Sequence, residues 1–344
     1  MINSQIKIAF WGLIALWVML VIAATTQGAM ALSLADLMAV FQSFGDEISQ
    51  QQGNLALNRY VILELRLPRI VTACVVGAGL AAAGVCMQGL FRNPLADPSL
   101  IGVSSGASLG AVLVIVLGSG IVMSAWLQAF LLPLAAFVGG LIATLVVYGI
   151  ATRHGNADIH RLLLAGIAIN AMAGAGVGLL SYIATDNQLR DLTFWSMGSV
   201  AKAGWQELAV AAPVIVLASV QLMRYRKALD SLLMGEAIAR QIGHDVLRIK
   251  RGIIVCATLI VGTAVSMSGV ILFVGLVIPH LVRLALGPGH QHVLPLSMLA
   301  GACLMLVGDL IARTAVAPAE LPIGLLMSLV GGPFFIALLL RQRL

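Results

Sequence analysis

Side chains capable of covalent chemistry are few in this sequence, and their spacing matches no common catalytic or metal-binding motif. The four cysteines all lie inside apolar stretches, without a CxxC pair: Cys74, Cys86, Cys256 and Cys303. Zinc sites need Cys and His at short fixed spacings, so we expect these thiols to be small buried side chains. The motifs HExxH, GxSxG and the phosphate-binding GxxxxGK(S/T) are also absent. The sequence therefore predicts no enzyme activity, no metal site, no bound cofactor and no ATP site in this chain.

The remaining polar residues can pair with charged groups rather than react with a substrate. Arg66 and Arg69 flank a Leu-Pro pair at the start of one apolar stretch, and Arg313 follows Asp309 by four residues near the end of another. We expect the three arginines at helix ends, where a long side chain can carry its charge into water. These arginines could bind a charged partner, or they could only anchor the helices at the membrane surface. Arg313 could also only form an ion pair with Asp309 within its own helix.

The composition requires a membrane environment. Of the 344 residues, 60% are hydrophobic and 10% are charged, whereas a soluble domain has about 25% charged residues. So few polar side chains cannot cover a water-exposed surface of this size, but a surface that faces lipid must be apolar. The net charge of +6 is not concentrated in a basic arm or a lysine-rich tract. Nucleic acid is therefore not an expected partner.

A membrane-spanning helix needs about 20 mostly apolar residues, and we identify ten candidates. The first has 28 uncharged residues between Lys7 and Asp36. A signal-peptide core has about 7–15 residues, so we expect this stretch to be retained as a helix. The uncharged stretch 98–152 should break near Gly118, and Gly269 with Pro279 should bend or break the stretch 252–282. The expected spans are 8–32, 66–91, 99–118, 121–151, 162–184, 206–223, 250–269, 271–287, 293–312 and 322–340.

Basic residues indicate the orientation of these spans. With the N-terminus in the cytoplasm, 14 of the 20 Lys and Arg residues fall on the cytoplasmic side, as the positive-inside rule requires. Both termini are then cytoplasmic. All six histidines also fall near that side, and we expect His290 and His292 in a solvated loop.

Two connecting segments are long: an external one at 33–60 and a cytoplasmic one at 224–251. The apolar residues at 232–234 and 237–239 predict a short amphipathic helix in the second segment, closed by Gly243. This helix could lie on the lipid surface, or it could bind a cytoplasmic partner.

Three motifs follow one another between about residue 60 and the C-terminus. The first is RLPR at 66–69 with MQGLFRNPLADP at 87–98, and the second is GEAIARQIG at 235–243. The third is GLVIPHLVR at 275–283, followed by ELPIG at 320–324. Together they resemble the FecCD family, the permease subunits of ATP-binding-cassette (ABC) importers for ferric siderophores, haem and vitamin B12. The loop at 192–199 is most similar to that of haem-importing members.

The resemblance implies an architecture and a set of partners. The expected fold is all-α, a single transmembrane permease domain over residues 1–344 like that of the vitamin B12 importer. The chain is expected in the bacterial inner membrane as a homodimer or paired heterodimer, with the substrate path at the dimer interface. Two cytoplasmic ATPase subunits would bind ATP and Mg²⁺, and a periplasmic binding protein would deliver the cargo.

The resemblance also implies roles for individual residues. Three arginines would dock the binding protein: Arg66, Arg69 and Arg313. The segment that couples to the ATPase would contain Gly235, Glu236, Ala237, Ala239, Arg240 and Gly243. Because Glu236 and Arg240 are four residues apart, they could instead only stabilise their own helix.

A cytoplasmic gate and a translocation path are implied as well. The gate would contain Asn93, Leu95, Asp158, Ile159 and His160. Related permeases often have small hydroxylated residues at the second gate segment, and Ile159 and His160 depart from that pattern. Asn93 and Asp158 could instead cap helix ends. The path would be lined by Gly166, Met172, Gly174, Gly178 and Trp195, although close helix packing also explains glycines in a span, and Trp195 could be an interfacial aromatic.

The expected function is inward transport of haem by alternating access. A ferric siderophore or vitamin B12 is the alternative cargo. Haem iron is commonly held by His, Met, Tyr or Cys, and no histidine ligand is expected along the external entry path. An ion-coupled carrier or an intramembrane enzyme would usually need ionisable groups at mid-membrane, which most of the spans lack.

Overall fold

A computed structural model describes residues 2–28, 30–42, 54–118, 125–152, 159–317 and 319–341. Every regular element in these ranges is a helix, which confirms the predicted all-α fold. Seven of these helical stretches are long and apolar enough to span a membrane, and three further apolar helices are shorter. These ten correspond to the ten expected spans: α1 (Ile2–Thr26), α4 (Leu67–Phe91), α5 (Val103–Leu117), α6 (Ala125–Thr152), α7 (Ile159–Ile183), α9 (Trp205–Arg224), α12 (Val246–Ser268), α13 (Val274–Leu286), α14 (His290–Thr314) and α15 (Ile323–Arg341).

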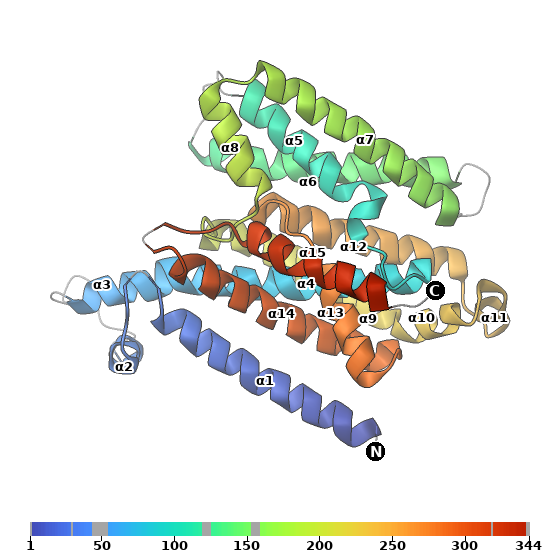
Figure 1. Ribbon diagram of the computed structural model, residues 1–344, viewed down its shortest axis with the longest axis horizontal. Helices are drawn as coiled ribbons and strands as arrows, with labels where there is room; N and C mark the ends of the chain where they lie inside the picture. The colour runs from blue at the N-terminus through green and yellow to red at the C-terminus, as the bar shows by residue number, and fades with distance from the viewer. Residues whose placement is uncertain are drawn as a thin grey trace.

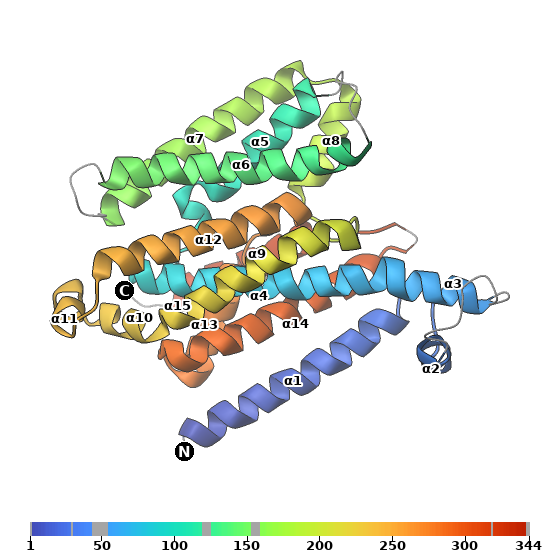
Figure 2. The same cartoon turned by 180° about the vertical axis from the view of Figure 1, so that it is seen from behind.

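Shorter helices connect the long ones. They are α2 (Leu34–Gln42), α3 (Asn54–Tyr60), the π-helix η2 (Val61–Arg66), the 3₁₀-helix η3 (Pro98–Ile101), α8 (Asp186–Ser196), α10 (Arg226–Leu233) and α11 (Glu236–Gln241). Figures 1 and 2 show that the long helices run between two ends of the molecule. One end carries α2, α3 and α8, and is called the α3 end here. The other carries α10, α11 and the start of α1, and is called the α11 end.

Helix α4 forms the core of the larger group of helices. It packs against α9, α12, α13 and α14, and most of its residues are buried. Helices α5, α6 and α7 pack on one another and are joined to the rest mainly through α12 (Figure 1). Helix α1 lies along the outside, where it contacts α14 and has mostly exposed apolar side chains. The packed pair of α4 and α14 therefore runs from one end of the molecule to the other.

Glycine and alanine allow α4 to approach its neighbours closely. A Cβ atom on Gly77 would lie 2.3 Å from the carbonyl oxygen of Gly301 in α14. A Cβ atom on Gly84 would lie 1.9 Å from the carbonyl oxygen of Gly275 in α13. Both are closer than any side chain can approach, so only glycine fits. Small residues at helix contacts are typical of membrane proteins, because packing rather than water exclusion holds the helices together.

The helix boundaries differ from the expected ones at two places. Helix α1 begins and ends six residues earlier than expected, because polar residues near its start can remain at the membrane surface. The helix that contains α4 continues backwards through η2 and α3 to Asn54. The segment 33–60 is therefore largely helical where it is described, and its central residues 43–53 lie outside the described ranges.

Helix α2 is held in place by its own start and by α3. Ser33 and Asp36 cap it reciprocally, since the backbone N–H of each residue bonds to the side chain of the other. The Asn58 side chain of α3 donates a further hydrogen bond to Asp36 over 3.2 Å. The hydrogen bonds from the Ser33 hydroxyl and backbone N–H lower the pKa of Asp36 below its usual value.

The stretch 252–282 breaks at Gly269 but not at Pro279. Gly269 has a φ of +66° and ends α12, whereas Pro279 lies inside the regular helix α13. Proline lacks the N–H that would bond to the carbonyl of Gly275. The side-chain amide of Gln88 lies 3.3 Å from that carbonyl oxygen and supplies a donor. The proline is tolerated because a neighbouring helix satisfies the freed backbone group.

The prediction of a single amphipathic helix over residues 232–239 is wrong. The chain instead forms α10 and α11, with a sharp break at Gly235. Gly235 has φ +119° and ψ 152°, a backbone conformation that is essentially restricted to glycine. Gly243, with a φ of +95°, ends the segment as expected.

Candidate functional site

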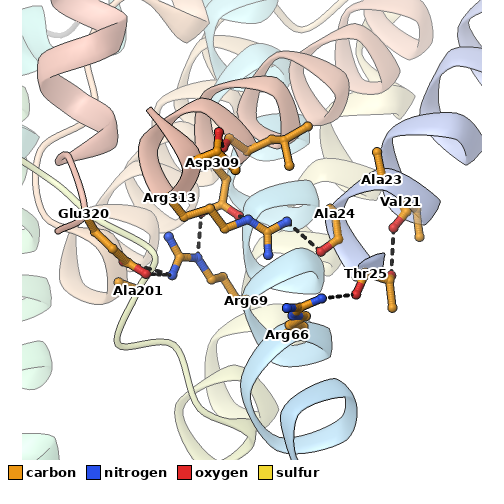
Figure 3. Close-up of polar contacts among 12 residues, drawn as sticks. Val21, Ala23, Ala24, Thr25, Arg66, Arg69, Ala201, Asp309, Arg313 and Glu320 are labelled. Carbon is orange, nitrogen blue, oxygen red and sulfur yellow. Dashed lines mark hydrogen bonds and ion pairs between the residues drawn. The ribbon is translucent and has the colours of Figure 1, made fainter. Parts of the chain in front are cut away.

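A cluster of charged residues lies near the α3 end, between α4, α14 and the C-terminus of α1 (Figure 3). The Arg69 Nε atom donates to Asp309 over 2.6 Å, and its Nη1 atom donates to the two carboxylate oxygens of Glu320 over 2.9 and 3.0 Å. Asp309 is completely buried, whereas the Glu320 side chain is 44% exposed. Arg69 of α4 therefore binds α14 in the interior of the molecule, through Asp309. At the surface it binds the segment before α15, through Glu320.

The other two arginines of the cluster bind the C-terminal end of α1. Arg313 donates to the Ala24 carbonyl over 2.6 Å, and its Nε atom lies 3.6 Å from Asp309. Arg66 donates to the carbonyls of Thr25 and Met30. The last carbonyls of a helix have no partner inside the helix and carry partial negative charge. The two guanidinium groups satisfy these carbonyls, so α1 is tied to α4 and α14.

This arrangement corrects the expected position and exposure of the arginines, because Arg66 and Arg69 lie inside the continuous helix from Asn54 to Phe91 and only Arg313 lies near a helix end. The side chains of Arg66, Arg69 and Arg313 are buried rather than extended into water. The ion pair of Arg313 with Asp309 is present, although it is long. We call Arg66, Arg69, Asp309, Arg313 and Glu320 the arginine cluster. Its three guanidinium groups face two carboxylates, and Glu320 is its exposed carboxylate. Docking of another protein there stays a prediction.

The second site is the α10–α11 segment (226–243) at the α11 end. Leu229 and Leu232 are buried in α10, which packs against α4, α9 and α14. Ala239 is the buried residue of α11. Of the expected coupling residues, Ala237 and Arg240 are exposed and Ala239 faces the protein interior. Ala239 therefore holds α11 to the bundle rather than offering a surface to a partner.

The α10–α11 segment also has exposed apolar residues that the motif did not single out. Met234, Ile238 and Ile242 occupy positions four residues apart and are all substantially exposed. Exposed apolar patches of this kind usually mark interaction surfaces. Because Gly235 breaks the helix between Met234 and Ile238, their i, i+4 spacing in the sequence does not by itself place these side chains on one face.

Two polar contacts of this region, an ion pair and a hydrogen-bonded Asp–His pair, are not predicted by the sequence. Glu236 Oε1 lies 2.6 Å from Lys250 Nζ of α12, in addition to its 3.3 Å contact with Arg240. His290, the first residue of α14, binds Asp230 of α10 through both its backbone N–H and its ring. The expectation of a solvated loop is therefore wrong for His290, which is 1% exposed. The sequence gives no direct signal for these contacts, because their partners come from different helices.

The expected gate residues occupy two separate segments. Asn93 is exposed and follows α4, and its side-chain oxygen accepts a hydrogen bond from the Leu95 N–H over 2.9 Å. This bond stabilises a turn rather than a helix start, and Asp97 caps η3 instead. Ile159 and His160 are the first residues of α7. Asp158 lies outside the described residues.

The expected path residues separate into two groups. Gly166 is buried, and a Cβ atom on it would lie 1.8 Å from the Leu100 carbonyl oxygen, so it serves close packing of α7 on η3. Trp195 is half-buried against the core. Met172 is 68% exposed, and Gly174 and Gly178 face open space on the surface of α7. This α7 surface also exposes Leu179 and could contact either lipid or another protein chain.

Comparison of the sequence with known proteins identifies one family of membrane permeases. The sequence matches the FecCD transport family over residues 15–341. It is 46% identical over 284 residues to the hemin transport system permease protein HmuU of Yersinia pestis, which covers 83% of this chain and 84% of that protein. It is 42% identical over 283 residues to the cobalamin import system permease protein BtuC of Halobacterium salinarum, which covers 82% of this chain and 74% of that protein.

A solved structure has the same fold. An ABC transporter of metal-chelate type, in an inward-facing conformation, matches with a TM-score of 0.83 and 34% sequence identity. The match covers 97% of this chain and 99% of that one.

Proposed function

Because this chain belongs to the FecCD transport family and is a multi-pass permease of the ABC-importer type, we propose that it carries haem inward across the bacterial inner membrane. The observation that supports haem is the 46% identity to a hemin permease over 83% of the chain. In this proposal two copies of the chain form the path between them and work by alternating access.

The proposed orientation places the α11 end in the cytoplasm and the α3 end outside. The α10–α11 segment then faces the ATPase. Its exposed apolar side chains, Met234, Ile238 and Ile242, would enter an apolar cleft of that subunit, with Arg240 at the rim. Both features suit a partner interface, which typically combines an apolar centre with a polar edge. ATP and Mg²⁺ would be bound and used by the partner only.

The arginine cluster is the proposed docking site for a periplasmic binding protein. Its buried arginines cannot reach far from the surface, so a partner carboxylate would have to approach Arg69 in place of the exposed Glu320. The excess of guanidinium groups over carboxylates favours an acidic partner surface. Such charge complementarity mainly sets the association rate and the register of docking.

The exposed surface of α7 is the proposed contact with the second copy and the wall of the path. Met172, Gly174 and Gly178 lie there, and small and apolar residues suit a large flat amphipathic cargo. The segments with Asn93, Leu95, Ile159 and His160 are proposed to close the cytoplasmic side of this path. Asp158 belongs to the same proposal on the basis of the sequence alone.

The proposal is tested by uptake in cells that lack their own importers. The cells would express this chain with its ATPase and binding protein, and haem, cyanocobalamin and several ferric siderophores would be offered separately. We expect ATPase-dependent uptake of haem and background uptake of the others. Uptake that persists with a hydrolysis-deficient ATPase would instead indicate an ion-coupled carrier.

Vitamin B12 is the second candidate cargo. It is supported by the 42% identity to the Halobacterium salinarum cobalamin permease, which is close to the value for the hemin permease. Uptake of cyanocobalamin without haem in the same experiment would select it and retain the rest of the architecture.

A further inference from the structure

The α10–α11 segment is attached to the long helices by one polar contact on each side of Gly235: the Asp230–His290 hydrogen bonds on one side and the Glu236–Lys250 ion pair on the other. Gly235 has an open environment and a φ of +119°, so it can act as a hinge. Helix α11 has only six residues, too few to be stable without tertiary contacts. The position of each half of the segment therefore depends on its attachment to the bundle.

Asp230 attaches α10 to the start of α14. Its Oδ1 atom accepts the backbone N–H of His290 over 2.8 Å and lies 2.7 Å from Nδ1 of the same residue. Gly289, at the capping position of α14, has no side chain to satisfy the first N–H groups. The carboxylate of Asp230 takes over this role from another helix, where the positive end of the helix dipole favours it.

His290 also contacts the centre of the bundle. A Cβ atom on Gly89 of α4 would lie 2.6 Å from the Nε2 atom of His290. The ring is thus enclosed between α4 and α10, and its Nε2 atom has no hydrogen-bond partner among the described residues. The ring cannot move away from Asp230 without displacing α4 or α10.

Lys250 attaches α11 to the N-terminal part of α12. Its side chain is 7% exposed, and its Nζ atom lies 2.6 Å from Glu236 Oε1. Breaking such a pair leaves a buried ammonium group without its carboxylate, which is costly. The two halves of the segment are therefore fastened to two different helices, α10 to α14 and α11 to α12.

We propose that Asp230, His290 and Lys250 are positioning residues that fasten the α10–α11 segment to α14 and α12, so that a displacement of this segment moves those helices instead of being absorbed at Gly235. This inference rests on the proposed coupling of the segment to an ATPase. A displacement that left α12 behind would separate the buried Lys250 ammonium from Glu236, and one that left α14 behind would take the Asp230 carboxylate away from the His290 N–H and ring. The cost of that separation makes joint movement the favoured response.

The test uses the assembled importer in lipid vesicles, with ATP hydrolysis and haem uptake measured on the same preparation. Asp230→Asn keeps the shape and the acceptor for the His290 N–H but removes the charge. Lys250→Met removes the buried charge, and Lys250→Arg keeps it. Arg248→Ala is the matched control, because its ion pair with Asp245 lies in the same region but is exposed.

We expect Asp230→Asn and Lys250→Met to retain the ATPase subunit and its basal hydrolysis. Uptake per ATP hydrolysed should fall about tenfold, a typical size for coupling between two sites. Lys250→Arg and Arg248→Ala should remain within about twofold of the wild type. Wild-type levels of uptake per ATP in both Asp230→Asn and Lys250→Met would overturn the inference. A wild-type complex without ATP-dependent uptake of any cargo would instead refute the proposed function.

A second measurement does not depend on the stability of these variants. Spin labels at Lys227→Cys and Gln291→Cys, both exposed positions, report the distance between the start of α10 and the start of α14. We expect the same distance in the nucleotide-free and ATP-bound complex. A distance that changes between the two states would show that α10 moves independently of α14 and would overturn the inference.

Discussion

At the scale of single residues, the arginine cluster depends on one buried carboxylate. Asp309 lies between Arg69 and Arg313, at 2.6 and 3.6 Å from their Nε atoms. Both arginines also hold other segments, since Arg69 binds Glu320 and Arg313 binds the end of α1. Asp309 therefore influences the position of three segments through two neighbours, although its own side chain is completely buried.

We predict that Asp309→Ala lowers the free energy of unfolding by about 3–5 kcal/mol, because two buried guanidinium groups lose their carboxylate. Thermal unfolding of the purified protein in detergent would measure the loss. Glu320→Gln is the control, since its half-exposed pair should contribute no more than about 1 kcal/mol. Equal stability of Asp309→Ala and the wild type would contradict this account.

The exposed carboxylate of the cluster gives a prediction about docking. Glu320→Gln should increase the affinity for the binding protein several-fold, because it leaves Arg69 without a surface carboxylate and adds positive charge to the site. The gain should shrink as salt is raised, since exposed charges are screened. Surface plasmon resonance at two salt concentrations would measure it. An affinity independent of this substitution would argue that the cluster only anchors α1.

At the scale of helices, glycine sets both the close contacts and the breaks. Gly77 and Gly301 bring α4 and α14 together through their backbones. Gly235 does the opposite, because its unusual backbone angles interrupt what would otherwise be one amphipathic helix. The same residue type thus joins two helices side by side and divides a third stretch in two.

Gly77→Ala should lower the free energy of unfolding by about 1–3 kcal/mol, since the new methyl group overlaps the Gly301 carbonyl and forces α4 away from α14. The matched control is Gly149→Ala on the exposed surface of α6, where no atom lies within 4 Å of the added carbon. That change should be neutral or slightly stabilising. Unfolding midpoints of the two variants would distinguish crowding from a general effect of alanine.

Gly235→Ala should strain the connection between α10 and α11 by about 1–3 kcal/mol. Because α11 would leave its place, we expect weaker binding of the ATPase subunit, by about tenfold for each 1.4 kcal/mol that the strain contributes. The amount of ATPase that co-purifies with the permease would measure this. The control is Gly12→Ala in α1, where the added carbon has no neighbour within 4 Å. This variant should co-purify with as much ATPase as the wild type does.

At the scale of the whole molecule, the two ends are connected through α4 and α14. The arginine cluster joins these helices at the α3 end, the Gly77–Gly301 contact joins them in the middle, and His290 with Gly89 joins them at the α11 end. Helices α5, α6 and α7 form a separate group, and α12 lies between them and this pair (Figure 2). The exposed α7 surface belongs to that group, so the proposed path wall is distinct from the α4–α14 connection.

A second copy on the α7 surface can be detected by cross-linking. Met172→Cys should form a covalent dimer with a short thiol cross-linker in membranes, because Met172 is exposed on the proposed dimer contact. Leu145 on α6 is also apolar and more than half exposed but lies on another helix, so the Leu145→Cys variant should stay monomeric. Dimers from Leu145→Cys alone would place the second copy on α6 instead.

The sequence by itself determined the membrane class, the ten spans and the family motifs. These are local properties: an apolar stretch of sufficient length must be a helix in lipid because its backbone has no other hydrogen-bond partners. It also placed Gly243 correctly at the end of the α10–α11 segment. The sequence also indicated Arg66, Arg69 and Arg313 as candidate partner contacts, which stays a prediction, but it did not predict that their side chains are buried.

Only the tertiary structure decided which polar groups meet. Arg69 and Asp309 are 240 residues apart in the chain, and Asp230 and His290 are 60 apart. Hydrophobic periodicity carries no signal for such pairs, because it describes one helix at a time. Arg66 and Arg313 are buried because the carbonyls at the end of α1 happen to lie within their reach. Whether a charge at a helix end faces water or a neighbouring helix depends on how the helices pack.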